Sequence, residues 1–405
     1  MSRRPRIAIT LGDPCGIGPE LLLRSLTAIQ VWSDVVVVGS RAGVDLLEGL
    51  PGTAVTWCWD PSSAPPPPAF QGSALELRIE GPQGSAAAIW LDPTPDIGVG
   101  DLHLGRGSSA SGRATVEAIR LAAGLASSGL VDALVTLPMA KSAAHLAGYD
   151  IPGHTEFLQA LSGSPLTRMA FVSPRLSVVL HTVHQSLRSV VDGLEVQAVA
   201  ETLAFSADRF IQLTGNPNLR VALCALNPHA GEAGAFGQEE ALLSEALARA
   251  EAAFRKAGPA GPFAALPSPF PSGPAPQGWT LHPGETARVP VEAGGPSPNF
   301  LGPRFSGPHP SDSLFHRAVS GEFDLVVALY HDQGLIPIKL LEPTRAVNLT
   351  LGLPFIRTSP DHGTAFDKAG HWIADPRNFL EATALAVRLA GRARHQPWTA
   401  RVATP

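Results

Sequence analysis

Short runs of apolar, often β-branched residues recur along the chain, each bounded by glycine, proline or polar turn residues. Runs of this length and composition are typical of buried strands. We therefore predict strands at Arg6–Leu11, Val35–Val38, Ala133–Val135, Leu176–His181, Val221–Leu226, Leu325–Leu329 and Val347–Leu351.

Helical patterns lie between several of these runs. Ala114–Ala126 places apolar side chains on one stripe, and Ser109 and Ser111 ahead of it are candidate caps. Glu239–Lys256 is rich in alanine, leucine and glutamate and ends at Gly258, a typical helix stop. Continuous apolar strands that alternate with helices predict an α/β fold with a buried sheet.

Two proline-rich segments interrupt the alternation. Pro61–Pro68 contains a run of four prolines, and Gly258–Ser306 is dense in proline and glycine. Such segments cannot continue a helix, so we expect loops or partly ordered insertions. A linker between two independent domains is the weaker alternative, because the chain after Gly307 again carries clustered polar residues.

Composition narrows the class of protein. A chain of 405 residues with 44% hydrophobic residues predicts two domains or one large α/β unit. The net charge of −5, with no basic run beyond Arg3 and Arg4, argues against a nucleic-acid partner. No apolar run approaches the roughly 20 residues of a membrane span, and no secretion signal is expected. Three scattered cysteines without Cys-x-x-Cys spacing favour a reducing cytoplasm.

Three histidines stand just after predicted strands, each in a turn-forming context: His184, His229 and His331. Ligands in open α/β sheets bind beyond strand ends, and three imidazoles with an open position are typical of a catalytic metal site. Each histidine alone is more often a hydrogen-bonded core or turn residue. His181, in the same run as His184, leaves open which of the two is the ligand.

Other polar residues form candidate anion sites. His154 and Thr155 follow a proline–glycine turn, and Lys141 lies close in sequence; together they could hold a phosphate or a carboxylate. Lys339, Asn348 and Arg357 each interrupt an apolar stretch. A buried cation needs a partner, which can be an internal carboxylate or a bound phosphate, and spacing alone slightly favours the carboxylate.

A glycine-rich loop, Gly12–Glu20, follows the first predicted strand and opens a helix. Glycines there let backbone N–H groups approach an anion. The spacing matches neither Gly-x-Gly-x-x-Gly nor a phosphate-binding P-loop, so ligand contact and a plain tight turn remain equally open.

Several longer motifs together resemble one family. Gly-Asp-Pro-Cys-Gly-Ile-Gly-Pro-Glu, Gly-His-Thr-Glu, Asn-Pro-His-Ala-Gly-Glu, Gly-Pro-His-Pro-Ser-Asp-Ser-Leu-Phe, Tyr-His-Asp-Gln-Gly and Asn-Leu-Thr-Leu-Gly-Leu-Pro-Phe-Ile-Arg-Thr-Ser-Pro-Asp-His-Gly-Thr-Ala occur in this order. They look like the PdxA family, the 4-hydroxythreonine-4-phosphate dehydrogenases of vitamin B6 biosynthesis. The chain departs from that pattern in its long proline-rich segment and in Cys15, where alanine is usual.

The resemblance implies a two-domain fold like that of the isocitrate and isopropylmalate dehydrogenases, with a cleft between the domains. On this basis we expect a first α/β domain of residues 1–135 plus 340–405. The second domain, residues 136–339, would carry the metal ligands, the dimer contacts and the insertion at 258–306. A cytoplasmic homodimer with an active site shared between subunits is implied, with one metal ligand supplied by the other subunit.

The resemblance also implies roles for residues. The metal ligands fall on His184, His229 and His331, with Zn²⁺ expected and Mg²⁺, Mn²⁺ or Co²⁺ as alternatives. NAD would bind without the usual glycine fingerprint. The substrate contacts fall on His154, Thr155, Lys339, Asn348 and Arg357. The cofactor contacts fall on Asp361, His362, Gly363 and Thr364.

The implied reaction is NAD-dependent oxidation and decarboxylation of 4-phosphooxy-L-threonine to 3-amino-2-oxopropyl phosphate. Asp312 and Lys141 are the candidates for the base, and the sequence does not choose between them. Another phosphorylated hydroxy acid, such as phosphoerythronate, is an alternative substrate. A metal-dependent hydrolase or lyase that needs no NAD is an alternative class.

Overall fold

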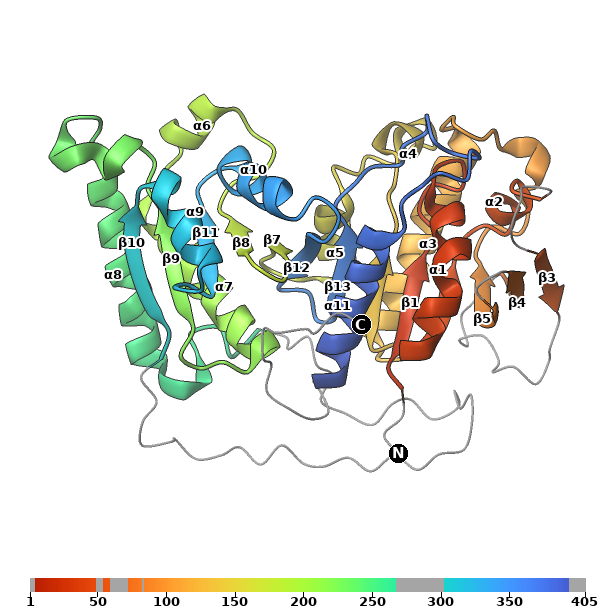
Figure 1. The fold of residues 1–405 in the computed structure, drawn as a ribbon, viewed down its shortest axis with the longest axis horizontal. Helices are drawn as coiled ribbons and strands as arrows, with labels where there is room; N and C mark the ends of the chain where they lie inside the picture. The colour runs from red at the N-terminus through yellow and green to blue at the C-terminus, as the bar shows by residue number, and fades with distance from the viewer. Residues whose placement is uncertain (1–3, 49–53, 59–71, 82–83, 267–301, 393–405) are drawn as a thin grey trace. The chain divides into compact units, whose positions relative to one another are not determined.

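Apolar runs of the sequence form the central strands of two compact units, each a sheet with helices on its faces (Figure 1). The computed structural model describes residues 4–48, 54–58, 72–81, 84–266 and 302–392. Within them, unit 1 contains the residues up to 165 and those from 353 onward, and unit 2 contains the stretch between. The domain boundaries expected from sequence, at 135/136 and 339/340, stay a prediction.

Unit 1 takes strands from both ends of the chain. Its strand order is β13-β6-β1-β2-β5-β4-β3, parallel from β13 to β5 and antiparallel beyond. The strands are β1 (Arg6–Thr10), β2 (Asp34–Val38), β3 (Ala54–Cys58), β4 (Ser73–Gly81), β5 (Gly84–Asp92), β6 (Ala133–Thr136) and β13 (Ile356–Pro360). The helices are α1 (Gly18–Trp32), α2 (Ala42–Asp45), α3 (Ser109–Ser127), α4 (Lys141–Leu146), α5 (His154–Ser162) and α11 (Arg377–Arg392), with a 3₁₀ turn at Val99–Asp101.

Both faces of this sheet are covered, which explains its nearly continuous apolar strands. One core joins Ala8 and Leu134 of the sheet to Ile119 of α3 and Leu158 of α5. Helices α1 and α11 lie in front of the strands in Figure 1. The covered sheet positions the strand ends at which the polar motifs stand.

Unit 2 has the strand order β10-β9-β11-β8-β7-β12. Strands β10, β9, β11 and β8 are parallel, and β7 is antiparallel to both of its neighbours. The strands are β7 (Arg168–Val172), β8 (Ser177–Leu180), β9 (Arg220–Cys224), β10 (Arg304–His309), β11 (Leu325–Ala328) and β12 (Val347–Leu351). The helices are α6 (Leu187–Asp192), α7 (Val196–Thr214), α8 (Glu239–Ala257), α9 (Ser311–Val319) and α10 (His331–Leu341), with short turns η2 (Pro228–Gly234) and η3 (Gly258–Ala260).

The expected strands are all present, with ends shifted by at most two residues. The α/β fold class is confirmed. Both expected helices are present as well, but the cap of α3 needs correction. Ser108, rather than Ser109, is its N-cap, and Ser108 and Ser111 exchange side-chain and backbone hydrogen bonds of 3.1 and 2.9 Å.

The prediction that Gly258–Ser306 forms a loop is wrong at both ends of this segment. Gly258–Ala260 forms η3, and Arg304 begins β10, which pairs with β9. Phe263 accepts a hydrogen bond of 2.8 Å from Arg209 Nη2, which ties this turn to α7. The middle of the segment, residues 267–301, and the expected loop Pro61–Pro68 lie outside the described residues.

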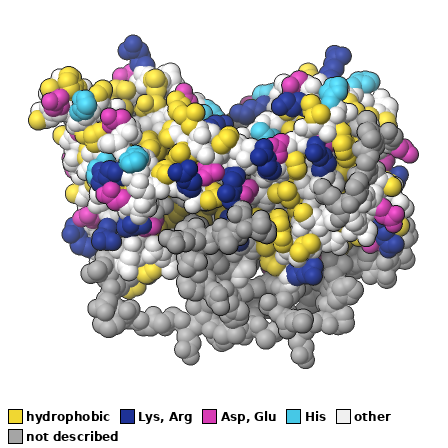
Figure 2. Space-filling model, viewed as in Figure 1, with side chains coloured by type: hydrophobic (Ala, Val, Ile, Leu, Met, Phe, Trp, Pro, Cys, Tyr) yellow, Lys and Arg dark blue, Asp and Glu magenta, His cyan; other side chains and the backbone are white. Residues whose placement is uncertain are grey.

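Acidic side chains lie among the basic ones over the face shown in Figure 2. No helix in the described ranges is both long and apolar enough to cross a membrane.

Candidate functional site

The three candidate metal ligands follow three neighbouring strands of unit 2. His184 comes after β8, His229 after β9 and His331 after β11. These strands are adjacent and parallel, in the order β9-β11-β8. The three histidines therefore stand beyond one edge of the same sheet, where α/β proteins bind ligands.

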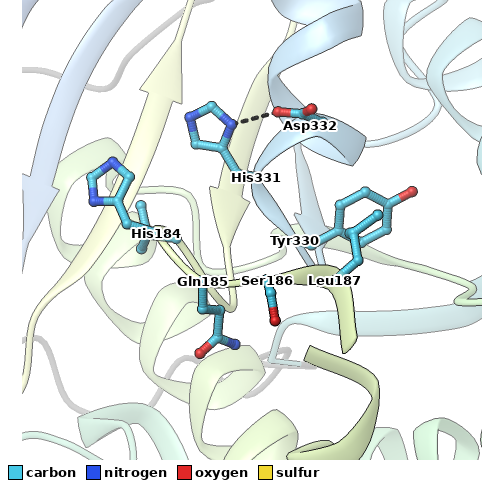
Figure 3. A pocket seen from close by; sticks show the side chains of 8 residues that line it. His184, Gln185, Ser186, Leu187, Tyr330, His331 and Asp332 are labelled. Carbon is cyan, nitrogen blue, oxygen red and sulfur yellow. Dashed lines mark hydrogen bonds and ion pairs between the residues drawn. The ribbon is translucent and has the colours of Figure 1, made fainter. Parts of the chain in front are cut away.

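Two of these histidines line a common pocket. The ring centroids of His184 and His331 are 6.0 Å apart, and the ring planes are tilted by 40°. Figure 3 shows both rings at the pocket lined by Tyr330, Asp332 and residues 183–187. Asp332 Oδ1 lies 2.7 Å from His331 Nδ1, a contact that fixes the ring and leaves Nε2 for a ligand.

A buried glutamine holds this edge of the sheet together. Gln333 Oε1 accepts the backbone N–H of Leu329 at 2.7 Å, and its Nε2 donates to the carbonyl of Ala225 at 2.8 Å and to Ser311 Oγ at 3.0 Å. It thereby connects the ends of β11 and β9 to the start of α9. Asp312, a candidate base, is the exposed second residue of α9.

His229 lies in a left-handed turn. Residues His229 to Ala233 all have positive φ, between 42° and 74°, although only Gly231 among them is a glycine. Non-glycine residues in this region cost about 1–2 kcal/mol each, so neighbouring contacts must hold the turn. Asn227 supplies such contacts, because its N–H donates to Glu240 at 2.8 Å and its Nδ2 to Glu239 at 2.7 Å.

The fit of a metal ion to these residues can be judged from the donor set. Imidazole nitrogens suit Zn²⁺, and the rings of His184 and His331 lie 6.0 Å apart, centroid to centroid, at one pocket. Within the described residues of one chain, no three His, Cys, Asp or Glu side chains gather as a complete metal site. One chain thus presents a fitting but incomplete ligand set.

A second group of candidates gathers in unit 1 around Arg357 on β13. Arg357 is 2% exposed, and its Nε and Nη2 donate to Thr136 Oγ1 at 3.1 and 2.6 Å. Burial lowers the pKa of Arg357 to about 10, partly offset by the carboxylate of Glu156. The guanidinium stays charged at neutral pH, and a buried cation of this kind attracts an anion.

His154 and Lys141 belong to the same group. His154 is the first residue of α5, and its Nε2 is buried without a hydrogen-bond partner among the described residues. Burial and the charges of Arg357 and Lys141 hold its pKa well below the usual value, so the ring is neutral. Thr155 beside it is buried, and Lys141 is the exposed first residue of α4. A phosphate or carboxylate would find a cation and an imidazole here.

Lys339 and Asn348 lie in unit 2. The expectation that Lys339 is buried in an apolar stretch is wrong, since it stands on an exposed position of α10. The apolar residues around it include Ile336 and Leu340, which are exposed too. Asn348 is the second residue of β12, and its Oδ1 is buried and accepts no hydrogen bond from the described residues.

The expected cofactor residues Asp361, His362, Gly363 and Thr364 follow β13 in unit 1. Thr364 accepts the N–H of Ile17 at 3.0 Å, so this segment packs on the glycine-rich loop after β1. The Nε2 of His362 is buried without a partner among the described residues, and burial lowers the pKa of the ring.

The glycine-rich loop itself is a tight turn. Gly12 has φ +71°, and a Cβ on it would come within 2.4 Å of the Pro138 carbonyl. Asp13 is buried and accepts hydrogen bonds from Cys15 N–H at 3.0 Å and Ser111 Oγ at 3.3 Å. Burial nevertheless raises the pKa of Asp13 to about 6.

Sequence reasoning missed three residues of these groups. Thr136 looked like one more β-branched strand residue, and only the register of two strands distant in sequence reveals its contact with Arg357. Asp332 and Gln333 stand directly after His331, and a polar pair behind a candidate ligand is a signal that could have been used.

Comparison with known proteins assigns this architecture to a family. The family described as "Pyridoxal phosphate biosynthetic protein PdxA" matches residues 75–266 and 299–386. The chain belongs to the PdxA family. The match covers the histidines, the Arg357 group and the segment after β13, and it leaves out residues 1–74, 267–298 and 387–405.

Curated relatives of the PdxA type extend over nearly the whole chain. A protein from Desulfosudis oleivorans named 4-hydroxythreonine-4-phosphate dehydrogenase is 34% identical over 391 residues, covering 96% of each chain. A protein from Cupriavidus necator named D-threonate 4-phosphate dehydrogenase is 34% identical over 393 residues, covering 96% of this chain and 98% of its own. The crystal structure of 4-hydroxythreonine-4-phosphate dehydrogenase from Klebsiella pneumoniae is similar, with a TM-score of 0.69 at 33% identity, covering 95% of this chain and 99% of that one.

Proposed function

We propose that this chain is an NAD-dependent dehydrogenase that oxidises 4-phosphooxy-L-threonine in pyridoxal phosphate biosynthesis. Carbon C3 would transfer a hydride to NAD⁺ while its hydroxyl loses a proton to a base, and the resulting β-keto acid would lose CO₂ and take up a proton at C2 to give 3-amino-2-oxopropyl phosphate. The observation that carries the proposal is the pair of imidazoles, His184 and His331, 6.0 Å apart beyond adjacent parallel strands. Open α/β proteins bind their ligands beyond the carboxyl ends of the strands, where these two histidines stand.

The three histidines are the proposed metal ligands. A divalent ion held by His184, His229 and His331, Zn²⁺ or else Mg²⁺, Mn²⁺ or Co²⁺, would supply a Lewis acid that lowers the pKa of an alcohol. Because one chain presents an incomplete set, we propose that a cytoplasmic homodimer completes it. Asp332 orients the His331 ring through its 2.7 Å contact.

The remaining residues bind and orient the substrate. Arg357, His154 and Thr155 are proposed to bind the phosphate or carboxylate of the substrate, a role that the charge on Arg357 and the unpartnered His154 Nε2 support, and Lys339 and Asn348 are proposed as further contacts. Fixing the charged ends of a small substrate holds its reacting carbon in place and removes an entropic barrier. Asp312 and Lys141 are the two candidates for accepting the alcohol proton. Asp361 to Thr364 are proposed to contact NAD.

The name of one relative supports a second candidate substrate, D-threonate 4-phosphate. The Cupriavidus necator relative is as similar as the Desulfosudis oleivorans relative, and its name specifies D-threonate 4-phosphate. This compound carries a hydroxyl where 4-phosphooxy-L-threonine carries an amino group, and both contain a phosphate and a carboxylate. The Arg357 group would bind either, so the substrate must be determined by assay.

The test is NADH formation with each of the two phosphorylated substrates, before and after removal of metal by a chelator. We expect turnover with one of them, loss on chelation and recovery with Zn²⁺. Substituting His184→Ala or His331→Ala should lower kcat about 1000-fold, because a Lewis acid contributes several kcal/mol to the barrier.

The matched control is His316→Ala, an exposed histidine on α9 that belongs to neither group. It should keep wild-type kcat and KM. Full activity of His331→Ala after chelation would remove the metal from the mechanism, and hydrolysis without NADH would place the chain in a different class.

A further inference from the structure

Thr136, at the end of β6, occupies a position that the proposed function leaves unused. It is 1% exposed, and Arg357 on the adjacent strand is 2% exposed. The register pairs Arg357 with Leu134, and side chains two residues apart on a strand share a face. The guanidinium therefore extends along the sheet toward the carboxyl ends of the strands, where it reaches Thr136.

The Thr136 hydroxyl only accepts in its hydrogen bonds with Arg357. Its Oγ1 accepts from Arg357 Nε at 3.1 Å and from Nη2 at 2.6 Å, and arginine can only donate. A threonine hydroxyl has two acceptor positions and one O–H, so both acceptor positions are taken. The O–H has no acceptor among the described residues of the chain. A hydroxyl that accepts from a cation is polarised and becomes a better donor.

The surroundings determine what such a donor can bind. The charged groups around it include the Arg357 cation and the Glu156 carboxylate that partly offsets the effect of burial on Arg357, and the neutral His154 ring nearby has a buried Nε2 without a described partner. An anionic oxygen is the acceptor that gains most from a polarised hydroxyl beside a guanidinium. An oxyanion bound beside Arg357 and His154 would therefore supply the acceptor that the Thr136 O–H lacks among the described residues.

We propose that Thr136 is a further residue of the anion site: it holds the Arg357 guanidinium in position and donates its hydroxyl proton to the same bound oxyanion. The inference rests on the proposed function insofar as Arg357 binds the phosphate or carboxylate of the substrate. Thr136 takes no part in hydride transfer, so its effect belongs to binding.

The decisive comparison is Thr136→Val with Thr136→Ser. Valine keeps the shape and removes the hydroxyl, whereas serine keeps the hydroxyl. A hydrogen bond to a charged group contributes about 1.5–3 kcal/mol, so Thr136→Val should raise KM about 10- to 100-fold with kcat changed less than about fivefold. Thr136→Ser should stay within about threefold of wild type. If both variants only lower Tm and leave KM unchanged, Thr136 is structural and the proposal is overturned.

A binding measurement separates this inference from the proposed function. Inorganic phosphate and acetate are titrated into the wild type and Thr136→Val by calorimetry, without turnover. Phosphate or acetate binding that weakens about tenfold or more in Thr136→Val supports the site even if no NADH forms with any substrate, and the better of the two probes identifies the oxyanion. Binding unaffected by the substitution overturns the inference. Thr136→Ala gives the same readout if the valine variant does not fold.

Discussion

At the scale of the residue, unit 1 buries ionisable groups beside the carboxyl ends of its strands. Asp13 after β1, Arg357 on β13 and His154 at the start of α5 all have pKa values displaced by burial toward the neutral form. Burying them costs stability, because water solvates a charge better than a few hydrogen bonds do. Proteins accept such a cost mainly where a ligand later compensates the charge.

The cost in stability of burying an ionised side chain can be measured at Asp13. Its folded pKa of about 6 exceeds the unfolded value of 3.8, so the folded state binds the proton more tightly. Protonated Asp13 therefore favours folding, and this contribution is lost as pH rises through 6. We expect the free energy of unfolding of wild type, minus that of Asp13→Asn, to fall by about 2 kcal/mol between pH 4.5 and 7.5. Urea denaturation across this range measures it.

Asp96→Asn is the matched control. Asp96 is exposed, and its hydrogen bond with Arg113 lowers its pKa. Its titration therefore lies below the pH window, and the corresponding difference should be flat. Parallel pH profiles for wild type and Asp13→Asn would show that Asp13 is ionised throughout the window.

The sequence alone identified candidate site residues only where a polar residue interrupts or ends an apolar run. His184, His229 and His331 are visible because each ends an apolar run. Thr136 is not visible, because threonine is a common strand residue and its partner is 221 residues away. Lys339 was misjudged for a related reason: the apolar residues around it are exposed, and sequence does not show which apolar face remains uncovered.

At the scale of the element, helices α3 and α4 pack backbone to backbone. A Cβ on Gly112 of α3 would lie 2.0 Å from the carbonyl oxygen of Ala143 in α4. Glycine thus sets how closely α4, which begins at Lys141, can approach. The helix pattern in the sequence predicted α3 but not the reason for this glycine.

Gly112→Ala should force α3 and α4 apart. Overpacking of this kind costs about 1–3 kcal/mol, so we expect a loss of that size in the free energy of unfolding. Gly124→Ala in the same helix is the control, because Gly124 is exposed and has no neighbour within 4 Å. It should gain about 0.5–1 kcal/mol from helix propensity. Equal gains in both variants, measured by urea denaturation, would contradict the close packing.

Strands with mixed polarity were harder to predict than apolar ones. In β4, Leu75, Leu77 and Ile79 alternate with charged residues, a pattern of period two that the apolar-run criterion overlooked. β13 contains Arg357 as its second residue and was missed because a buried cation is unusual in a strand. β10 was missed because it begins within the proline-rich segment.

At the scale of the whole molecule, the long segment between η3 and β10 is additional to the family pattern. The PdxA match resumes at residue 299 after ending at residue 266. The chain before it is anchored by the hydrogen bond from Arg209 to Phe263, and the chain after it enters β10. The catalytic candidates all lie outside the segment, so its sequence should be dispensable.

We expect that replacing residues 270–296 with a short Gly/Ser linker leaves kcat and KM unchanged. Loop-closure entropy changes by only about 0.6 kcal/mol for each halving of length, so stability should change by about 1 kcal/mol at most. A variant with the same segment in shuffled order is the control for length. A folded protein with activity lost in both variants would assign the segment a role in catalysis.

The two-part construction of unit 1 has a consequence for how the protein is made. The described residues of unit 2 all lie between the two described parts of unit 1 along the chain, so the ribosome synthesises them before β13. Arg357 is synthesised 221 residues after Thr136. At a synthesis rate of about 5–20 residues per second, the interval between them is roughly 10–45 s. Until that strand emerges, one edge of β6 lacks its partner strand, and an unpaired strand edge is open to incorrect pairing with other chains.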